Sequence, residues 1–278
     1  MKIKLFLYRI KRFFINFFSF LEWRVRHFFF NFYNPFFNAI VKEQNIDFKK
    51  IPILIINFNQ LEYLRKLIVF LLKNEYKNIV VIDNNSTYPP LLEYYETINN
   101  SVTIKKMKTN VGHRVFWQNK NLYKKYGKGY YVITDSDIVP DQNCPSDFVS
   151  HFKKILDKNK NLIKVGFSLK IDDIPDSNIH KSKILNWEKQ FWEEQDENGD
   201  YISFIDTTFA LYRPINQFKL KFFYEAIRTQ YPYIAKHGGW YVNSGNLSEE
   251  QDFYRSTANE SSSWKVDEKG GIIEDMYK

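Results

Sequence analysis

The chain has 278 residues, 44% hydrophobic and 18% aromatic, which allows one large domain or two small ones around a sizeable core. Its single cysteine, Cys144, excludes an internal disulfide and a zinc site built from thiolates. The net charge of +8 lies almost entirely in residues 1–42, which hold eight Lys or Arg side chains and one acid, Glu22. The nearly neutral remainder argues against a basic nucleic-acid groove.

The basic N-terminal residues alternate with large aromatic ones. This combination favours an anionic membrane surface, where rings enter the interface and each Lys or Arg adds roughly 1 kcal/mol. The longest charge-free runs, 13–21 and 28–41, are too short or too interrupted for a transmembrane helix, which needs about 20 apolar residues. We therefore interpret residues 1–44 as a membrane-associating amphipathic helical segment. Helices packed on the body or on a partner, and single-stranded nucleic-acid binding through stacked rings, stay open as alternatives.

Strand-like and helix-like patterns alternate after a short polar linker. Continuous apolar runs of strand length are typical of strands buried on both faces of a parallel sheet, and helical periodicity separates them here. This alternation predicts a parallel sheet covered by helices, with ligands bound at the carboxyl ends of the strands. The predicted order is strand 51–58, helix 61–73, strand 78–83, helix 91–98, strand 102–107, helix 115–126 and strand 130–133.

Polar side chains follow each of these strands. A row of Asn and Asp at one sheet edge suits a polar ligand that carries a base, a ribose and phosphates. Neither G-x-G-x-x-G nor a P-loop lysine motif follows the first strand, so neither a dinucleotide site nor a Walker-type ATPase is supported. The residues in this row are Asn57, Asn59, Asp83, Asn110, Asp135 and Asp137.

Asp135 and Asp137 stand one residue apart, directly after the strand in GYYVITDSDIVP. Two carboxylates this close repel each other and are costly at the edge of a core. A divalent cation removes both problems: Mg²⁺ is usually held by one or two carboxylates plus substrate phosphates, and Mn²⁺ accepts the same oxygen ligands. A solvated turn with a helix cap is the alternative interpretation.

The pattern changes after residue 140. We expect a helix from Ser146, a strand at 162–171, a helix at 182–195 and a strand or strand pair at 201–213. Gly238 and Gly239 mark a turn. The body therefore extends from 45 to 246 with a division near 140, and residues 247–278 form a polar tail that is expected to lie over the surface.

Four segments together resemble GT-A fold glycosyltransferases, most like the large family-2 group. They are IPILIINFN, VVIDNNST, TNVGHRVFWQN and VITDSDIVP, which lie within residues 51–140, and YISFIDTTFALYRP is a weaker later match. The resemblance implies an α/β fold of GT-A type: a Rossmann-like, mostly parallel central sheet flanked by helices, here with an N-terminal amphipathic helical extension. Residues 45–140 would be the nucleotide-sugar-binding half and 141–246 the acceptor half.

The resemblance also implies roles for residues in the row. Asp83 would hydrogen-bond the donor's base, and Asn110 with the backbone near Gly112 would line the nucleotide pocket. Asp135 would face the ribose or reach the metal through water, while Asp137 would bind Mn²⁺ or Mg²⁺ that bridges the diphosphate. The donor would be a nucleotide-sugar, with a UDP-sugar favoured.

Two further roles follow less directly. Similar enzymes often use a late histidine as a metal ligand, which makes His237 in IAKHGGWY a candidate; a histidine hydrogen-bonded within the fold is the alternative. Inverting members place an acid to deprotonate the acceptor, often in a Glu-Asp pair that the expected region lacks. Asp206 is the first candidate, because an acid in an apolar strand needs a reason. Glu193 and Glu194 come next, and then Glu225.

The expected function is metal-dependent, inverting transfer of a hexose or N-acetylhexosamine to a glycan or lipid-linked acceptor. This reaction would serve cell-surface polysaccharide or lipopolysaccharide synthesis, with the enzyme peripheral on the cytoplasmic membrane face and without a nucleic-acid partner. A retaining transferase, a sugar nucleotidyltransferase and a catalytically idle membrane-bound scaffold stay open. A nucleotidyltransferase normally has a Gly- and Arg-rich loop where this chain has Asn57-Phe58-Asn59-Gln60.

Overall fold

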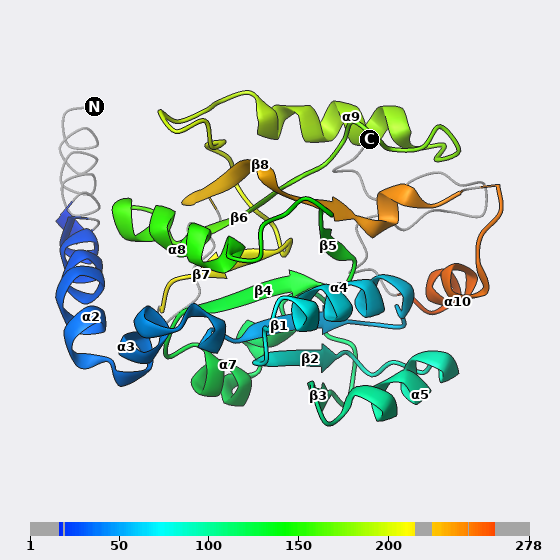
Figure 1. Cartoon of the computed structure of the whole chain (residues 1–278), viewed down its shortest axis with the longest axis horizontal. Helices are drawn as coiled ribbons and strands as arrows, with labels where there is room; N and C mark the ends of the chain where they lie inside the picture. Colours follow the sequence, from blue (N-terminus) through cyan, green and yellow to red (C-terminus); the bar gives the residue numbers. More distant parts are fainter. Residues whose placement is uncertain (1–16, 19, 215–223, 244, 259–278) are drawn as a thin grey trace, which may run out of the picture.

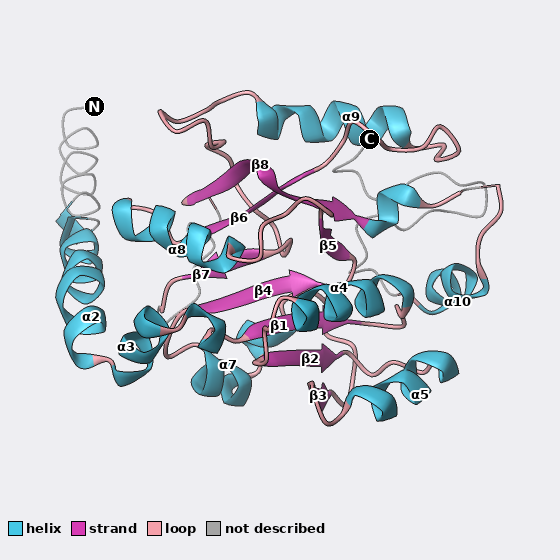
Figure 2. Ribbon diagram, viewed as in Figure 1, coloured by secondary structure: helices cyan, strands magenta, loops and turns pink. Residues whose placement is uncertain are grey.

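The structure, a computed structural model, describes residues 17–18, 20–214, 224–243 and 245–258. Its centre is one eight-stranded mixed sheet in the order β3-β2-β1-β4-β7-β6-β8-β5 (Figure 1). Figure 2 shows helices packed around this sheet and a helical arm at one edge of the body. The strands are β1 (Ile53–Asn57), β2 (Ile79–Asp83), β3 (Thr103–Lys106), β4 (Tyr131–Asp135), β5 (Ile138–Pro140), β6 (Lys164–Leu169), β7 (Ala210–Tyr212) and β8 (Ala226–His237).

The helices fall into an N-terminal arm and a body set. The arm consists of helical residues 20–28, the π-helix η1 (Phe29–Tyr33), α2 (Asn34–Phe37) and α3 (Ala39–Ile46). None of the helices described combines the length and the apolar character that a membrane crossing requires. The body contains η2 (Phe48–Lys50), α4 (Glu62–Lys73), α5 (Pro89–Ile98), α6 (Val115–Gln118), α7 (Lys120–Tyr126), α8 (Phe148–Lys158), α9 (Lys181–Glu188), η3 (Lys189–Trp192), η5 (Gly238–Tyr241) and α10 (Glu249–Thr257).

The first half of the sheet confirms the predicted alternation of strands and helices. β3, β2, β1 and β4 are all parallel, and Ile53 pairs with Ile79 on one side and with Val132 on the other. The single helix predicted at 115–126 is instead two, because Asn119 leaves helical geometry and its side chain caps the start of α7.

The second half adds antiparallel pairs. β7 runs antiparallel to both β4 and β6, while β6 and β8 are parallel and β5 closes the edge antiparallel to β8. Parallel pairs therefore predominate. The fold is the α/β arrangement of GT-A type that the sequence predicted, with a Rossmann-like first half and flanking helices.

Alternation along β1 distributes its side chains to two separate cores. Ile53 and Ile55 point to the face covered by α4 and α8, whereas Leu54 and Ile56 point to the face covered by α6 and α7. Burial of each such side chain contributes about 1.5–3 kcal/mol. Helices on both faces explain why the strands read as continuous apolar runs.

The predicted strand or strand pair at 201–213 was wrong over most of that range, and the sequence pattern did not predict β8. Only Ala210–Tyr212 is a strand there, and residues 202–206 have no regular structure. The Arg228 side chain donates to the Phe204 carbonyl (3.0 Å), so a side chain takes the place of a strand partner. β8 was not predicted because Arg228, Gln230 and Pro232 interrupt its apolar pattern.

The predicted polar tail contains α10, which begins with a capping box of Ser248 and Gln251. Glu250 reaches the start of α4, where its carboxylate accepts hydrogen bonds from the Leu61 amide (2.8 Å) and the Glu62 amide (3.1 Å). A carboxylate is favourable there because the first amides of a helix lack partners. This contact fixes α10 beside the carboxyl end of β1; residues 259–278 lie outside the described part.

A buried ion pair holds α9 to the sheet. Glu188 and Arg228 side chains are 2% and 3% exposed, and their charged atoms are 2.5 Å apart. Burial raises the pKa of Glu188 to about 7, and the charge of Arg228 opposes that rise. The same guanidinium lies over the Phe191 ring (4.2 Å). Arg228 therefore connects α9, η3 and the irregular loop at 202–206.

Loss of Arg228 alone should be costly. We expect Arg228→Met to lower the free energy of unfolding by about 3–5 kcal/mol, because it leaves Glu188 buried without its partner. Adding Glu188→Leu should recover much of the loss, since no charge then remains buried. Urea unfolding of the single and double variants measures both effects. A single variant within about 1 kcal/mol of wild type would contradict this reading.

Candidate functional site

The sheet register brings the predicted strand-end residues to one edge. Asn57 is the register partner of Asp83 across β1 and β2, and Ile56 is the partner of Asp135 across β1 and β4. Three polar side chains from distant parts of the sequence therefore lie at the carboxyl ends of neighbouring parallel strands, with Asn57 and Asp83 level and Asp135 one residue before them. This is the position at which open α/β sheets bind ligands.

Asp83 lies in a buried chain of hydrogen bonds. Asn57 donates from Nδ2 to the Tyr95 hydroxyl (2.8 Å), and that hydroxyl donates to Asp83 Oδ2 (2.7 Å). The Ser86 amide donates to Asp83 Oδ1 (2.9 Å). Burial and then the charge of Asp83 raise the pKa of Tyr95, which keeps its proton on the hydroxyl. The sequence did not indicate Tyr95, which α5 supplies.

Both polar atoms of the Asn59 side chain form hydrogen bonds within the protein. Its Oδ1 accepts from the Thr87 amide (2.7 Å) and the Tyr88 amide (3.0 Å), and its Nδ2 donates to Thr257 Oγ1 (2.9 Å). Its φ of 50° is in the left-handed region, which asparagine tolerates better than most residues. Asn59 thus joins the loop after β1 to the start of α5 and to the end of α10.

A second polar group forms where the loops after β2 and β3 meet. Asn84 donates from Nδ2 to the Gly112 carbonyl (3.1 Å), and Asn110 Oδ1 accepts from the Gly112 amide (2.9 Å). Gly112 has a φ of +79°, which favours glycine. Asn84 Oδ1 is buried and has no hydrogen-bond partner among the described residues. It is an acceptor that a ligand N–H could fill, and the sequence indicated only a polar turn there.

Asp137 and His237 meet across the edge of the sheet, because β5 and β8 pair Ile138 with His237. Asp137 Oδ2 and His237 Nδ1 are 3.3 Å apart. The nitrogen is buried, and its geometry toward the carboxylate is not that of a hydrogen bond. The His237 ring stacks on Trp240, with centroids 4.9 Å apart and planes at 7°. Both groups can therefore reach one cation.

The donor set fits a transition-type divalent cation. A carboxylate oxygen with an imidazole nitrogen suits Mn²⁺, whereas Mg²⁺ prefers oxygen ligands. The described residues contain no group of three or more His, Cys, Asp or Glu side chains placed to hold a metal. The protein would therefore supply Asp137 and His237, and ligand phosphates or water would complete the coordination.

The turn after His237 is packed closely on α4. A Cβ on Gly238 would come within 2.5 Å of the Tyr63 ring, so only glycine allows this approach. The Gly238 amide donates to the Asp137 carbonyl (2.7 Å), and the Gly239 amide donates to Asp137 Oδ2 (3.4 Å). The glycines of the predicted turn thus hold His237 against the Asp137 carboxylate.

Asp135 contacts the irregular loop before β7. Its Oδ2 accepts from the Thr207 hydroxyl (2.6 Å), and Asp206 Oδ1 accepts from the Thr207 amide (2.7 Å). Burial raises the pKa of Asp135 well above its usual range, with further contributions from the charges of Asp137 and Asp206; the Thr207 hydroxyl opposes them. Asp206 is therefore close to the Asp135 carboxylate.

Lys164 supports this loop from within the sheet. Its ammonium donates to the Ile205 carbonyl and lies 5.3 Å from the centroid of the Tyr212 ring. Burial lowers the pKa of Lys164 to about 7, with Asp206 acting in the opposite direction. The sequence did not indicate Lys164, because a lone lysine inside an apolar strand carries no motif.

The remaining candidate acids lie apart from these carboxylates. Glu193 and Glu194 are exposed after η3, and only the Glu194 backbone has a described bond, accepting from the Ile202 amide (2.8 Å). Glu225 precedes β8 and forms an ion pair with Arg26 of the arm (2.6 Å). Glu225 therefore belongs to the amino end of the sheet.

No family model and no curated protein matches the chain. Many solved structures are similar to it, including the following three. The mannosyltransferase PcManGT from Pyrobaculum calidifontis, in complex with GDP-Man and Mn²⁺, is 13% identical with a TM-score of 0.43 over 74% of this chain and 59% of its own. S. aureus TarS 1–349 is 17% identical, with a TM-score of 0.39 over 59% of this chain and 47% of its own. A cytidylyltransferase from Leptospira borgpetersenii is 13% identical, with a TM-score of 0.32 over 50% of this chain and 71% of its own.

The chain thus spans about half the length of the first two of these structures. Similarity at these values describes a general arrangement of strands and helices and does not identify an activity. The assignment of a function therefore depends on the residues at the carboxyl edge of this sheet.

Lys164 should make stability depend on pH. Between about pH 7 and its ordinary pKa of 10.5, the unfolded chain binds a proton that the folded chain releases. The free energy of unfolding should therefore rise with pH, by about 1.4 kcal/mol per unit for one proton. Lys164→Met should lack this rise in urea unfolding at pH 7, 8 and 9. Lys154→Met, at an exposed lysine, should follow wild type. Parallel curves for wild type and Lys164→Met would contradict the prediction.

Proposed function

We propose that this chain is a metal-dependent glycosyltransferase that moves a sugar from a nucleoside-diphosphate sugar to a glycan or lipid-linked acceptor. The observation that carries the proposal is the 3.3 Å approach of Asp137 Oδ2 and His237 Nδ1. This pair lies at the sheet edge where Asn57 and Asp83 also end their strands. A carboxylate and an imidazole beside a row of amide and carboxylate groups suit a diphosphate joined to a nucleoside.

Each residue of the edge has a task in this proposal. Asp137 and His237 would hold Mn²⁺, which when bound would supply positive charge to offset the negative charge of the nucleoside diphosphate leaving group. Trp240 fixes the His237 ring by stacking, and Gly238 and Gly239 fix the Asp137 backbone and carboxylate. These contacts orient the ligands before the donor binds, so little rearrangement is needed at the moment of reaction.

The nucleoside would bind over the ends of β1 and β2. The hydrogen-bonded chain of Asn57, Tyr95 and Asp83 makes this wall rigid. Asn84 Oδ1 is the acceptor available to an N–H of the base, and Asn110 orders the Gly112 loop beside it. In this proposal, both Asn84 and Asp83 contact the nucleotide base.

For the acceptor, we assign Asp206 as the base of an inverting reaction. Asp206 lies on the same loop as Thr207, whose hydroxyl bonds Asp135, and the loop is supported by Lys164. One of its oxygens binds the Thr207 amide, and the other is available to an acceptor hydroxyl. Glu194 has no comparable contact with the strand-end carboxylates and is the weaker candidate.

Metal-dependent nucleotide binding tests the donor half. Asp137→Asn and His237→Ala should each weaken Mn²⁺-dependent binding of UDP or GDP at least tenfold, because each removes a metal ligand. In a thermal shift assay, wild type at a nucleotide concentration of one hundred times Kd should gain about 2.7 kcal/mol, and the variants at the same concentration should gain at most about 1.4 kcal/mol. Asp172→Asn, on an exposed carboxylate of another loop, is the matched control. Unchanged Mn²⁺-dependent affinity in Asp137→Asn would refute the metal assignment.

Product analysis tests the reaction itself. Asp206→Asn should lower kcat about 10²- to 10⁴-fold, the usual contribution of general base catalysis, with donor affinity changed less than threefold. The assay measures UDP or GDP release from the matching sugar donors with glycan acceptors. Release of pyrophosphate from a nucleoside triphosphate and a sugar phosphate would instead identify a nucleotidyltransferase. Full activity in Asp206→Asn would exclude it as the base.

A further inference from the structure

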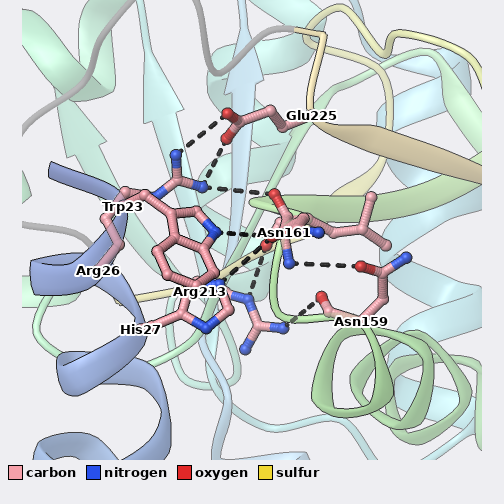
Figure 3. A network of polar contacts seen from close by, with 8 residues as sticks. Trp23, Arg26, His27, Asn159, Asn161, Arg213 and Glu225 are labelled. Carbon is pink, nitrogen blue, oxygen red and sulfur yellow. Dashed lines mark hydrogen bonds and ion pairs between the residues drawn. The ribbon is translucent and has the colours of Figure 1, made fainter. Parts of the chain in front are cut away.

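The N-terminal arm, residues 17–46, attaches to the body through a polar face. Arg26 donates to both oxygens of Glu225 (2.6 and 3.1 Å) and to the Asn161 carbonyl (3.4 Å). Figure 3 shows Trp23 and His27 directed at the Asn161 side chain, each 3.3 Å from its Oδ1. Paired, partly buried contacts of this kind hold a helix in a fixed orientation.

The next turns of the arm continue the same face. Phe30 is buried and lies over the Arg213 guanidinium (4.7 Å), which itself donates to carbonyls around the end of α8. Asn38 donates to the Lys128 carbonyl (2.7 Å). Gln44 exchanges two hydrogen bonds with the Tyr130 backbone, both 2.8 Å, directly before β4. The arm is thus attached to the body from Trp23 to Gln44.

The opposite face of the arm is aromatic and exposed. Phe36 and Phe37 are 61% and 73% exposed, although both lie in a helix beside a large body. Water favours the reverse arrangement, in which a helix buries its apolar stripe and exposes its polar one. Apart from Trp23, whose indole contacts Asn161, the exposed large apolar side chains of the arm are Phe17, Phe18, Phe20, Leu21, Val25, Phe28, Phe32, Tyr33, Phe36, Phe37, Ile40 and Ile46.

Positive charge accompanies this aromatic face. Arg24 and Lys42 are exposed on the arm, and of its two acids, Glu22 and Glu43, the exposed Glu43 is paired with Lys50 (3.4 Å). The first 16 residues of the sequence add five Lys or Arg side chains and no acid. Rings that enter the interface, with basic side chains at headgroup level, are the two signals that together hold a peripheral protein on anionic lipid.

We propose that the exposed aromatic face of residues 17–46 inserts into the interface of a membrane that contains anionic lipid. The contacts of Arg26, Phe30, Asn38 and Gln44 make the arm a rigid attachment that orients the body on that membrane. This inference rests on the arm alone and does not depend on the chemistry proposed for the carboxyl edge of the sheet.

Vesicle flotation of the full chain tests the proposal. The protein should float with phosphatidylcholine vesicles that contain 30% phosphatidylglycerol and should bind pure phosphatidylcholine at least tenfold more weakly. The double substitution Phe36→Ser and Phe37→Ser should reduce binding to the anionic vesicles at least tenfold. Val69→Ser with Ile202→Ser, at exposed apolar positions of the body, is the matched control and should bind as wild type does.

Two further measurements keep the result decisive. The arm variant should keep the wild-type unfolding midpoint and Mn²⁺-dependent nucleotide affinity, and Asp137→Asn should still float. Equal flotation of the arm variant and wild type would overturn the proposal. The proposal would also be overturned if the wild-type chain bound neither vesicle type but formed a concentration-dependent dimer that the arm substitutions abolish. The aromatic face would then be an interface with a second copy of the chain. Equal binding to both vesicle types would overturn the requirement for anionic lipid.

Discussion

The parallel register of β1 with β2 and β4 is the constraint from which the site follows. Ile53 pairs with Ile79 and with Val132, and this alignment carries forward until Asn57 lies level with Asp83 and the preceding residue, Ile56, lies level with Asp135. A shift of one residue along β1 would exchange the side chains of its two faces and separate these three groups. Both hydrophobic cores and the polar edge therefore depend on the same ladder of backbone hydrogen bonds.

Several buried charges near this edge are tolerated because each has a specific partner. Lys164 donates to a backbone carbonyl with a lowered pKa, Arg228 is paired with Glu188, and Asp135 accepts the Thr207 hydroxyl. The carboxylates of Asp135 and Asp137 still raise the cost of charge in a small volume. A bound divalent cation is the simplest way to lower that cost, which agrees with the proposed donor site.

The sequence predicted the elements whose local apolar pattern follows from their burial. It did not predict the elements whose composition is determined by contacts with residues far away in the sequence. β1, β2 and β4 were predictable because helices on both faces make these strands almost continuously apolar. β8 was not, since the polar side chains of Arg228 and Gln230 bond to the Glu188 carboxylate and the Asn198 carbonyl, about thirty to forty positions away. Tyr95 and Asn84 carry no motif. Glu225 was a candidate for the catalytic base, but its carboxylate forms an ion pair with Arg26, which lies 199 positions away in the sequence. The Asp137–His237 approach was foreseen only through a family resemblance.

The arm also determines the distance between the proposed reaction site and the membrane to which the arm is proposed to bind. Its attachments lie at the amino ends of β4 and β8, whereas Asp83 and Asp135 lie at carboxyl ends, and Figure 1 shows the arm and α10 at opposite sides of the molecule. The five residues of β4 alone span about 17 Å. On a membrane, the body would work as a spacer of fixed height. An acceptor attached to lipid would have to extend across that height, which favours the free end of an already lengthened glycan over a sugar next to the headgroup.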